Sequence, residues 1–99
     1  MNVNELFNLG LNFLNEGRSE TAMEIWNKVN ALDTNFAPVY LNQHNVFRGQ
    51  GNLVKARECL IKFLNCPMTG MTMDAVPQIK AQVAEIDKQL NPQLQQPLK

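Results

Sequence analysis

The chain has no net charge, little cysteine and no long apolar run. Nine basic residues balance nine acidic ones, so the formal net charge is zero. Proteins that bind nucleic acid or anionic membranes draw affinity from a basic excess, so neither partner is predicted. Two cysteines in 99 residues are too few for a disulfide scaffold, which favours a reducing, cytoplasmic location. No segment approaches the roughly 20 apolar residues of a membrane span, and the start, MNVNELFNLG, lacks the basic and apolar regions of a signal peptide.

Motifs that mark an enzyme are also scarce. The single histidine, His44, has no Ser, Cys or carboxylate next to it that would indicate a nucleophile–base pair. Gly49 and Gly51 are expected between two helices and not after a strand, so they do not predict a phosphate-binding loop. The sequence therefore predicts a protein that is not an enzyme and holds no cofactor.

An internal repeat is the strongest positive signal in the sequence. A shift of 34 residues superimposes an aromatic residue, a glycine and a small residue of one copy on those of the other: Phe13 on Phe47, Gly17 on Gly51, and Ala22 on Ala56. Within each copy, apolar residues recur at the three- and four-residue spacing of an amphipathic helix, both before and after the glycine. Two helix–turn–helix hairpins are therefore predicted, with Gly17 and Gly51 in their turns.

Several residues predict where the helices begin. Asn2 followed three positions later by Glu5 is typical of a capping box, in which each side chain bonds the other's backbone. Ser19 and Asn52 are expected to cap the second and fourth helices. Pro38 is expected near the start of the third helix, where its missing N–H costs least.

The amino-acid composition changes after the second copy of the repeat. Residues 65–74 read Asn-Cys-Pro-Met-Thr-Gly-Met-Thr-Met-Asp and predict a loop. A last helix is expected over about residues 74–91, with Pro77 in its first turn. Its apolar positions are spaced three and four residues apart: Val76, Ile79, Val83, Ile86 and Leu90. Segment 92–99 contains two prolines and much glutamine and is predicted to be disordered.

The repeat resembles the tetratricopeptide repeat, a helix–turn–helix unit of 34 residues. Its signature positions read Leu6, Leu9, Gly10, Phe13, Ala22, Trp26, Val29 and Thr34 in the first copy, and Tyr40, Gln43, His44, Phe47, Ala56, Leu60, Phe63 and Met68 in the second. The resemblance covers residues 1 to about 68 and implies an all-α solenoid of five helices. One domain of residues 1–91 would hold repeat 1 (about 3–36), repeat 2 (about 37–68) and a capping helix (about 74–91).

Small residues at signature positions have a physical reason. Gly10, Ala22 and Ala56 would let two helix axes approach closely, because a larger side chain would hold them apart. His44 stands in the second copy where the family usually has glycine. Two interpretations of His44 remain open: a wedge between helices with one nitrogen bonded to backbone or water, or a binding or pH-sensing residue.

The family binds other proteins in a concave groove lined by the first helix of each repeat. Carried over by position, the lining residues are Asn4, Phe7, Leu11, Leu14 and Asn15 from the first copy, and Leu41, Asn42, Asn45, Arg48 and Gly49 from the second. The resemblance thus implies a non-enzymatic interaction module for an amphipathic helix or an extended segment with hydrophobic anchors. The alternative for Phe7, Leu11 and Leu14 is that they only complete a small core.

Two other functions remain open. A self-assembling structural protein could pair the last helix, or the apolar groove, with a second copy of the chain. A cluster of sulfur-containing residues, Cys66, Met68, Met71 and Met73, is chemically suited to monovalent copper, although methionine also fills gaps where a loop packs on a core.

Overall fold

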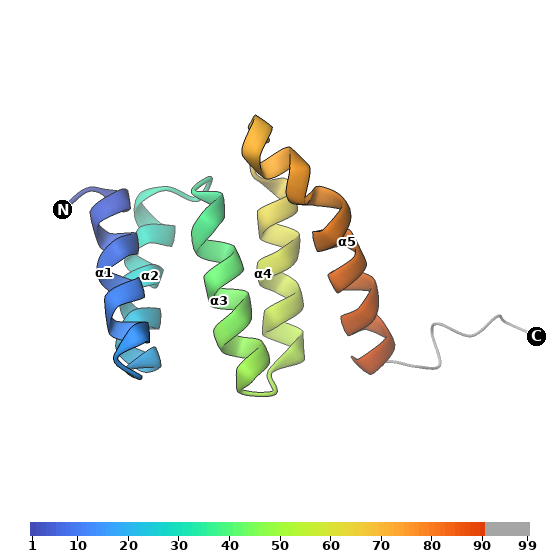
Figure 1. Cartoon of the computed structure of the whole chain (residues 1–99), viewed down its shortest axis with the longest axis horizontal. Coiled ribbons are helices and arrows are strands. Elements are labelled where there is room, and N and C mark those ends of the chain that lie inside the picture. Colours follow the sequence, from blue (N-terminus) through green and yellow to red (C-terminus); the bar gives the residue numbers. More distant parts are fainter. Residues whose placement is uncertain (91–99) are drawn as a thin grey trace, which may run out of the picture.

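The computed structural model describes residues 1–90, apart from the side chain of Met71, and this part of the chain is built of helices without a strand. The helices are α1 (Val3–Asn15), α2 (Ser19–Leu32), α3 (Ala37–Gly49), α4 (Leu53–Asn65) and α5 (Gly70–Leu90). Figure 1 shows two hairpins, α1 with α2 and α3 with α4, standing side by side, with α5 against α4 at the far end. The predicted all-α fold of five helices is confirmed. The end of the last helix at 91 and the disorder predicted for 92–99 lie outside the described residues.

The two hairpins turn in the same way. α1 and α3 have 13 residues each, and the glycine after each helix has a positive φ, 80° at Gly17 and 76° at Gly51. In the first turn, the Gly17 amide donates to the Leu14 carbonyl and the Arg18 amide donates to the Phe13 carbonyl, both at 2.9 Å. Both bonds recur 34 positions later in the second turn. This pattern needs a left-handed residue, which glycine adopts without steric cost, and it confirms both predicted turns.

Two of the three predicted helix caps are confirmed. Asn2 and Glu5 form the capping box of α1, with each side chain accepting from the other's backbone amide. The Asn52 side chain caps α4 by accepting from a backbone amide in its first turn. The prediction for Ser19 was wrong, because Ser19 is the first residue of α2 and Arg18 occupies the cap position without a side-chain bond.

α5 begins earlier than the sequence predicted. It starts at Gly70 and not near residue 74, so the loop predicted for 65–74 is limited to a short link after α4. Two threonines hold this start: the Thr69 amide donates to Oγ1 of Thr72 at 2.7 Å, and the Thr72 amide donates to Oγ1 of Thr69 at 3.4 Å. These bonds satisfy backbone N–H groups that a helix start otherwise leaves without partners.

The two prolines in these helices have different positions. Pro38 lies in the first turn of α3, as predicted. Pro77 lies inside α5 and not in its first turn, so that prediction was wrong. A proline inside a helix removes one backbone hydrogen bond and bends the axis, and Figure 1 shows α5 bent in its first half.

A single core runs through both hairpins and reaches α5. Its largest fully buried side chains are Trp26, Phe63, Leu60, Ile86, Val29 and Val39. Ile79 and Ile86 attach α5 to the second hairpin, and full burial of each such side chain stabilises the fold by about 1.5–3 kcal/mol. At the edge of this contact, Nε of Arg57 on α4 donates to Oδ1 of Asp87 on α5 at 2.5 Å.

Gly10 on α1 leaves room for the side chain of Trp26 on α2. A Cβ atom at Gly10 would lie 2.2 Å from Nε1 of Trp26, closer than atoms can pack. The indole therefore lies against the bare backbone of α1, where its Nε1 donates to the Phe7 carbonyl at 3.2 Å. The equivalent pair in the second hairpin is His44 and Leu60, both buried, so the large residue is on the leading helix there.

Candidate functional site

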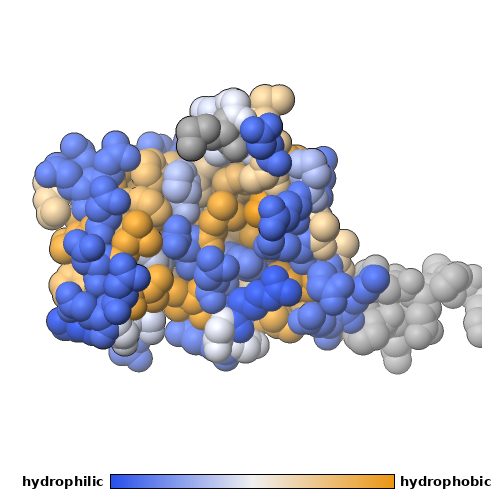
Figure 2. Space-filling view, viewed as in Figure 1, coloured by the Kyte–Doolittle hydropathy of each residue, from blue (hydrophilic) through white to orange (hydrophobic). Residues whose placement is uncertain are grey.

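One face of the molecule carries the leading helix of each hairpin. α1 lies in front of α2 in Figure 1, and Figure 2 shows the surface from the same side, with apolar areas between columns of polar side chains. Two hollows open on this face. Their lining places α1, α3 and α5 next to one another along it.

The first hollow, named the α1–α3 hollow, has a volume of about 350 Å³. Its lining residues are Leu14, Ser19, Asn45, Val46, Gly49 and Gln50. The second, named the α3–α5 hollow, has a volume of about 180 Å³. It is lined by Leu41, His44, Asn45, Ala75, Gln78, Ile79 and Gln82. Asn45 stands in the wall of both hollows, and neither contains a Lys, Arg, Asp or Glu side chain.

Four of the predicted lining residues come together at these hollows, since Gly49 also lines the first. Leu14 lines the first, Leu41 lines the second and Asn45 lines both. The Asn45 side chain is exposed, whereas Leu14 and Leu41 are half-buried and also pack on the core. The predicted residues that line the hollows thus lie on the second half of α1 and along α3.

The predicted apolar residues nearer the start of α1 serve the core instead. Phe7 packs edge-on against Phe36, with ring centroids 5.4 Å apart, and also meets Trp26 at 6.3 Å. Leu11 is half-buried and packs on the same core. The alternative that some of these side chains complete a small core therefore fits Phe7 and Leu11 best.

The remaining predicted binding residues border the face without lining a hollow. Asn4 and Asn15 are exposed at the two ends of α1. The Asn42 amide donates to the Pro38 carbonyl one turn earlier at 3.2 Å, so it is partly occupied within its own helix. Arg48 lies next to the α3–α5 hollow, because its guanidinium approaches Nε2 of His44 at 3.5 Å.

Sequence reasoning missed the contribution of α5 to the site. Gln78 and Gln82 lie one turn apart on α5 and face His44 and Leu41 across the α3–α5 hollow. Both lie outside the predicted apolar stripe of the last helix, so the sequence predicts no role for them in packing. The available signal was their i, i+4 spacing beside Ile79, which is 4% exposed and fixes which face of α5 meets the second hairpin.

His44 is buried, with 4% of its surface exposed. Burial lowers the pKa of its imidazole below the ordinary value of 6.5, and the positive charge of Arg48 lowers the pKa further, against weaker opposite effects of hydrogen bonds to Asn45 and Leu41. The ring is therefore neutral at pH 7. This placement supports the interpretation of His44 as a wedge between helices.

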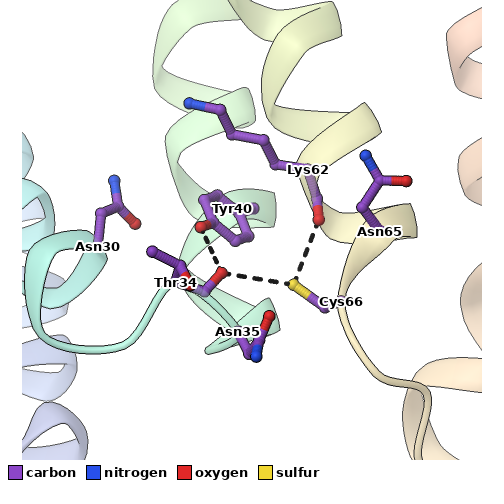
Figure 3. A pocket seen from close by; sticks show the side chains of 7 residues that line it. All are labelled: Asn30, Thr34, Asn35, Tyr40, Lys62, Asn65 and Cys66. Carbon is purple, nitrogen blue, oxygen red and sulfur yellow. Dashed lines mark hydrogen bonds between the residues drawn. The ribbon is translucent and has the colours of Figure 1, made fainter.

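A third hollow lies where the link between the hairpins meets the end of α4 (Figure 3). Its lining residues are Asn30, Thr34, Asn35, Tyr40, Lys62, Asn65 and Cys66. The Thr34 carbonyl accepts a bond from the Tyr40 hydroxyl at 2.6 Å and faces the Cys66 thiol at 3.9 Å, while that thiol also donates to the Lys62 carbonyl at 3.2 Å. These contacts tie the link to α3 and α4, and we assign them a structural role.

The two cysteines are buried in an environment that disfavours their metal-binding, thiolate form. Burial raises the pKa of the Cys66 thiol, which keeps it protonated and a poor metal ligand. Burial also raises the pKa of Cys59, to about 11. Met73 is exposed, and within residues 1–90 no three His, Cys, Asp or Glu side chains gather where they could hold an ion.

Polar side chains also fill the contact between the two hairpins. Gln43 is 3% exposed; its carbonyl accepts from the Asn30 amide at 3.2 Å, and its own amide donates to Asn27 at 3.4 Å. Oδ1 of Asn30 is buried without a partner. Since buried amides must bond in specific geometries, this network favours one way of stacking the hairpins.

No family model, curated protein or solved structure matches this chain. No helix among residues 1–90 has the length and apolar character required to cross a bilayer.

Proposed function

We propose that the chain is an interaction module of the tetratricopeptide type. It binds a segment of a partner protein along the face formed by α1, α3 and α5. The observation that carries this proposal is the pair of adjoining hollows on that face, which share Asn45 and lie between helices from both hairpins and α5. The identical turns and the 34-residue offset support the family assignment.

The lining of the hollows favours a partner segment with apolar anchors and few charges. Leucine, valine and isoleucine side chains provide apolar contact, and Asn45, Gln50, Gln78 and Gln82 provide amides that both donate and accept hydrogen bonds. A buried charge on the partner would lose its hydration without finding an opposite charge in the lining. A carboxylate at the edge of the site would find Arg48.

The sequence alternative, a self-assembling protein, has less support from the packing. One of its two predicted interfaces is the apolar stripe of the last helix. Ile79 and Ile86 of that stripe are buried within the chain, and Val83 packs on the same core.

The two cysteines are unpaired and buried, and we propose a reducing, cytoplasmic location for the module.

The test uses one substitution in the shared wall and one matched control. Asn45→Arg adds bulk and a charge where the hollows meet, at an exposed position that the core does not use. Asn12→Arg makes the same change at an exposed position of α1 outside both hollows. A partner captured by the native chain is expected to bind Asn45→Arg at least about tenfold more weakly, which is about 1.4 kcal/mol, and to bind Asn12→Arg normally. Equal binding to all three purified chains, measured by calorimetry, would show that the partner docks elsewhere.

A further inference from the structure

Arg48 stands where the two hollows approach each other on α3. His44, one turn before it, lines the α3–α5 hollow, and Gly49, the next residue, lines the α1–α3 hollow. Asn45 lines both and, three positions before Arg48, lies on the same side of the helix. Arg48 is half-buried and lines neither hollow itself. A partner segment that passes from one hollow to the other crosses α3 beside this guanidinium.

The positive charge of Arg48 is not paired with an acidic side chain. All nine acidic residues belong to residues 1–90, and the ion pair found in that part of the chain joins Arg57 to Asp87. Arg48 instead approaches a neutral group, with Nη1 at 3.5 Å from Nε2 of His44. A guanidinium can only donate, so Nε2 is the acceptor of this contact. The other N–H groups of the guanidinium can donate to a carboxylate that a partner supplies.

The surroundings of His44 and Arg48 are otherwise neutral. Across the α3–α5 hollow, α5 presents Ala75, Gln78, Ile79 and Gln82. On α4, which also packs on α3, Arg57 is paired with Asp87, and Cys59 is protonated because its pKa is about 11. Burial and the charge of Arg48 lower the pKa of His44, and no acidic side chain has a resolved effect on it. A carboxylate beside Arg48 would act in the opposite direction and raise this pKa.

We infer that the segment bound along this face carries an acidic side chain between two apolar anchors, and that its carboxylate accepts hydrogen bonds from Arg48 and Asn45 where the segment crosses α3. This inference rests on the proposed function and names the partner chemistry of the same face. The hollows lie on either side of one helix, so the anchors are separated by about 10 Å, the diameter of a helix. In an extended segment that distance corresponds to about three residues. The acidic residue lies within this interval.

The experiment selects binders of the purified chain from a library of random short peptides displayed on phage. Peptides that also bind Asn45→Trp are discarded, because this variant blocks the shared wall without adding a charge. The remaining peptides are expected to share two apolar residues with Asp or Glu between them. Selection on Arg48→Gln should retain the apolar pair and lose the acidic residue. Lys28→Gln removes a positive charge from an exposed position of α2 outside both hollows, and this control should retain the acidic residue.

Two measurements on a selected peptide place its carboxylate. Replacing the acidic residue by its amide should weaken binding to the native chain about fivefold, as expected for a partly exposed ion pair, and should leave binding to Arg48→Gln unchanged. His44 is the one histidine of the chain, so its imidazole NMR signals can be followed alone through a pH titration. The acidic peptide should raise the pKa of His44 more than the amide peptide does.

The outcomes separate this inference from the proposed function. Selected peptides without a preferred acidic residue, or an amide peptide that binds as tightly as the acidic one, would overturn the inference and leave the proposed function intact. Equal weakening on the native chain and on Arg48→Gln would also overturn it, since the carboxylate would then bond another group. If the native chain and Asn45→Trp retain the same peptides, the face formed by α1, α3 and α5 is not a binding site and both proposals fail.

Discussion

The contact between Gly10 and the Trp26 indole allows the effect of Gly10→Ala on stability to be predicted quantitatively. In an ordinary helix, Gly→Ala stabilises by about 1 kcal/mol, because alanine loses less backbone entropy on folding. At Gly10 the new methyl group would meet three atoms of the Trp26 indole ring, between 2.2 and 2.8 Å away. Trp26 is fully buried, so its ring cannot move aside into solvent.

The opposing terms can be weighed. Forcing a methyl group into a packed core costs about 1–3 kcal/mol. A displaced indole also loses its bond to the Phe7 carbonyl, which is worth about 1 kcal/mol. After the gain in helix propensity, Gly10→Ala should destabilise by about 2 kcal/mol. That corresponds to a melting temperature about 8–16 °C lower for a domain of this size.

Gly49→Ala is the matched control. Gly49 is also the helical glycine of a leading helix, but nothing lies within 4 Å of the position of its Cβ. Its substitution should stabilise by a few tenths of a kcal/mol or more. Urea unfolding followed by helical circular dichroism measures both changes. A Gly10→Ala chain as stable as the native protein would contradict this prediction. If the indole is the cause, Gly10→Ala should not lower stability further in a chain that already carries Trp26→Leu.

Three further predictions concern the turn glycines, His44 and Cys59. Gly17→Ala and Gly51→Ala should each lower the free energy of unfolding by about 1–2 kcal/mol, because both residues have a positive φ and nothing lies near the positions of their Cβ atoms. Urea unfolding that shows no loss for either variant would contradict the turn geometry. The pKa of His44 is lowered in the folded chain, so below about pH 6.5 unfolding takes up a proton at this residue. The contribution of His44 to stability should be constant above that pH and decline below it, and His44→Leu should remove this decline in urea titrations. Cys59, buried and with its pKa raised to about 11, should react with iodoacetamide only when the chain unfolds, which mass spectrometry at increasing urea would show; fast reaction in the native state would contradict the packing.

The sequence predicted those features that depend on a few neighbouring residues. The positive φ of Gly17 and Gly51 and the capping box of Asn2 and Glu5 are local, and the 34-residue offset marked the turns in both copies. The packing role of Gly10 was also visible, since a glycine inside a helix loses stability unless something lies against it.

The start of α5 and its role in the site could not be predicted in the same way. Gly70 and the methionines around it have the composition of a loop, and only the reciprocal bonds of Thr69 and Thr72 start a helix there. Pro77 is tolerated because the bent helix remains held by buried side chains further along it. The apolar stripe indicates which face of α5 packs on the second hairpin, but the contribution of Gln82 to the site also depends on where α5 lies relative to α3, a tertiary choice that periodicity does not fix.

The exchange of large and small residues between the hairpins has a consequence for folding. Two similar copies in one chain can mispair, with α1 taking α4 as its partner or α3 taking α2. In the first mispaired hairpin, Gly10 would face Leu60 and leave a void; in the second, His44 would be forced against the Trp26 indole. Each incorrect hairpin is thus penalised by shape, and the nascent chain is directed toward pairing neighbours in sequence.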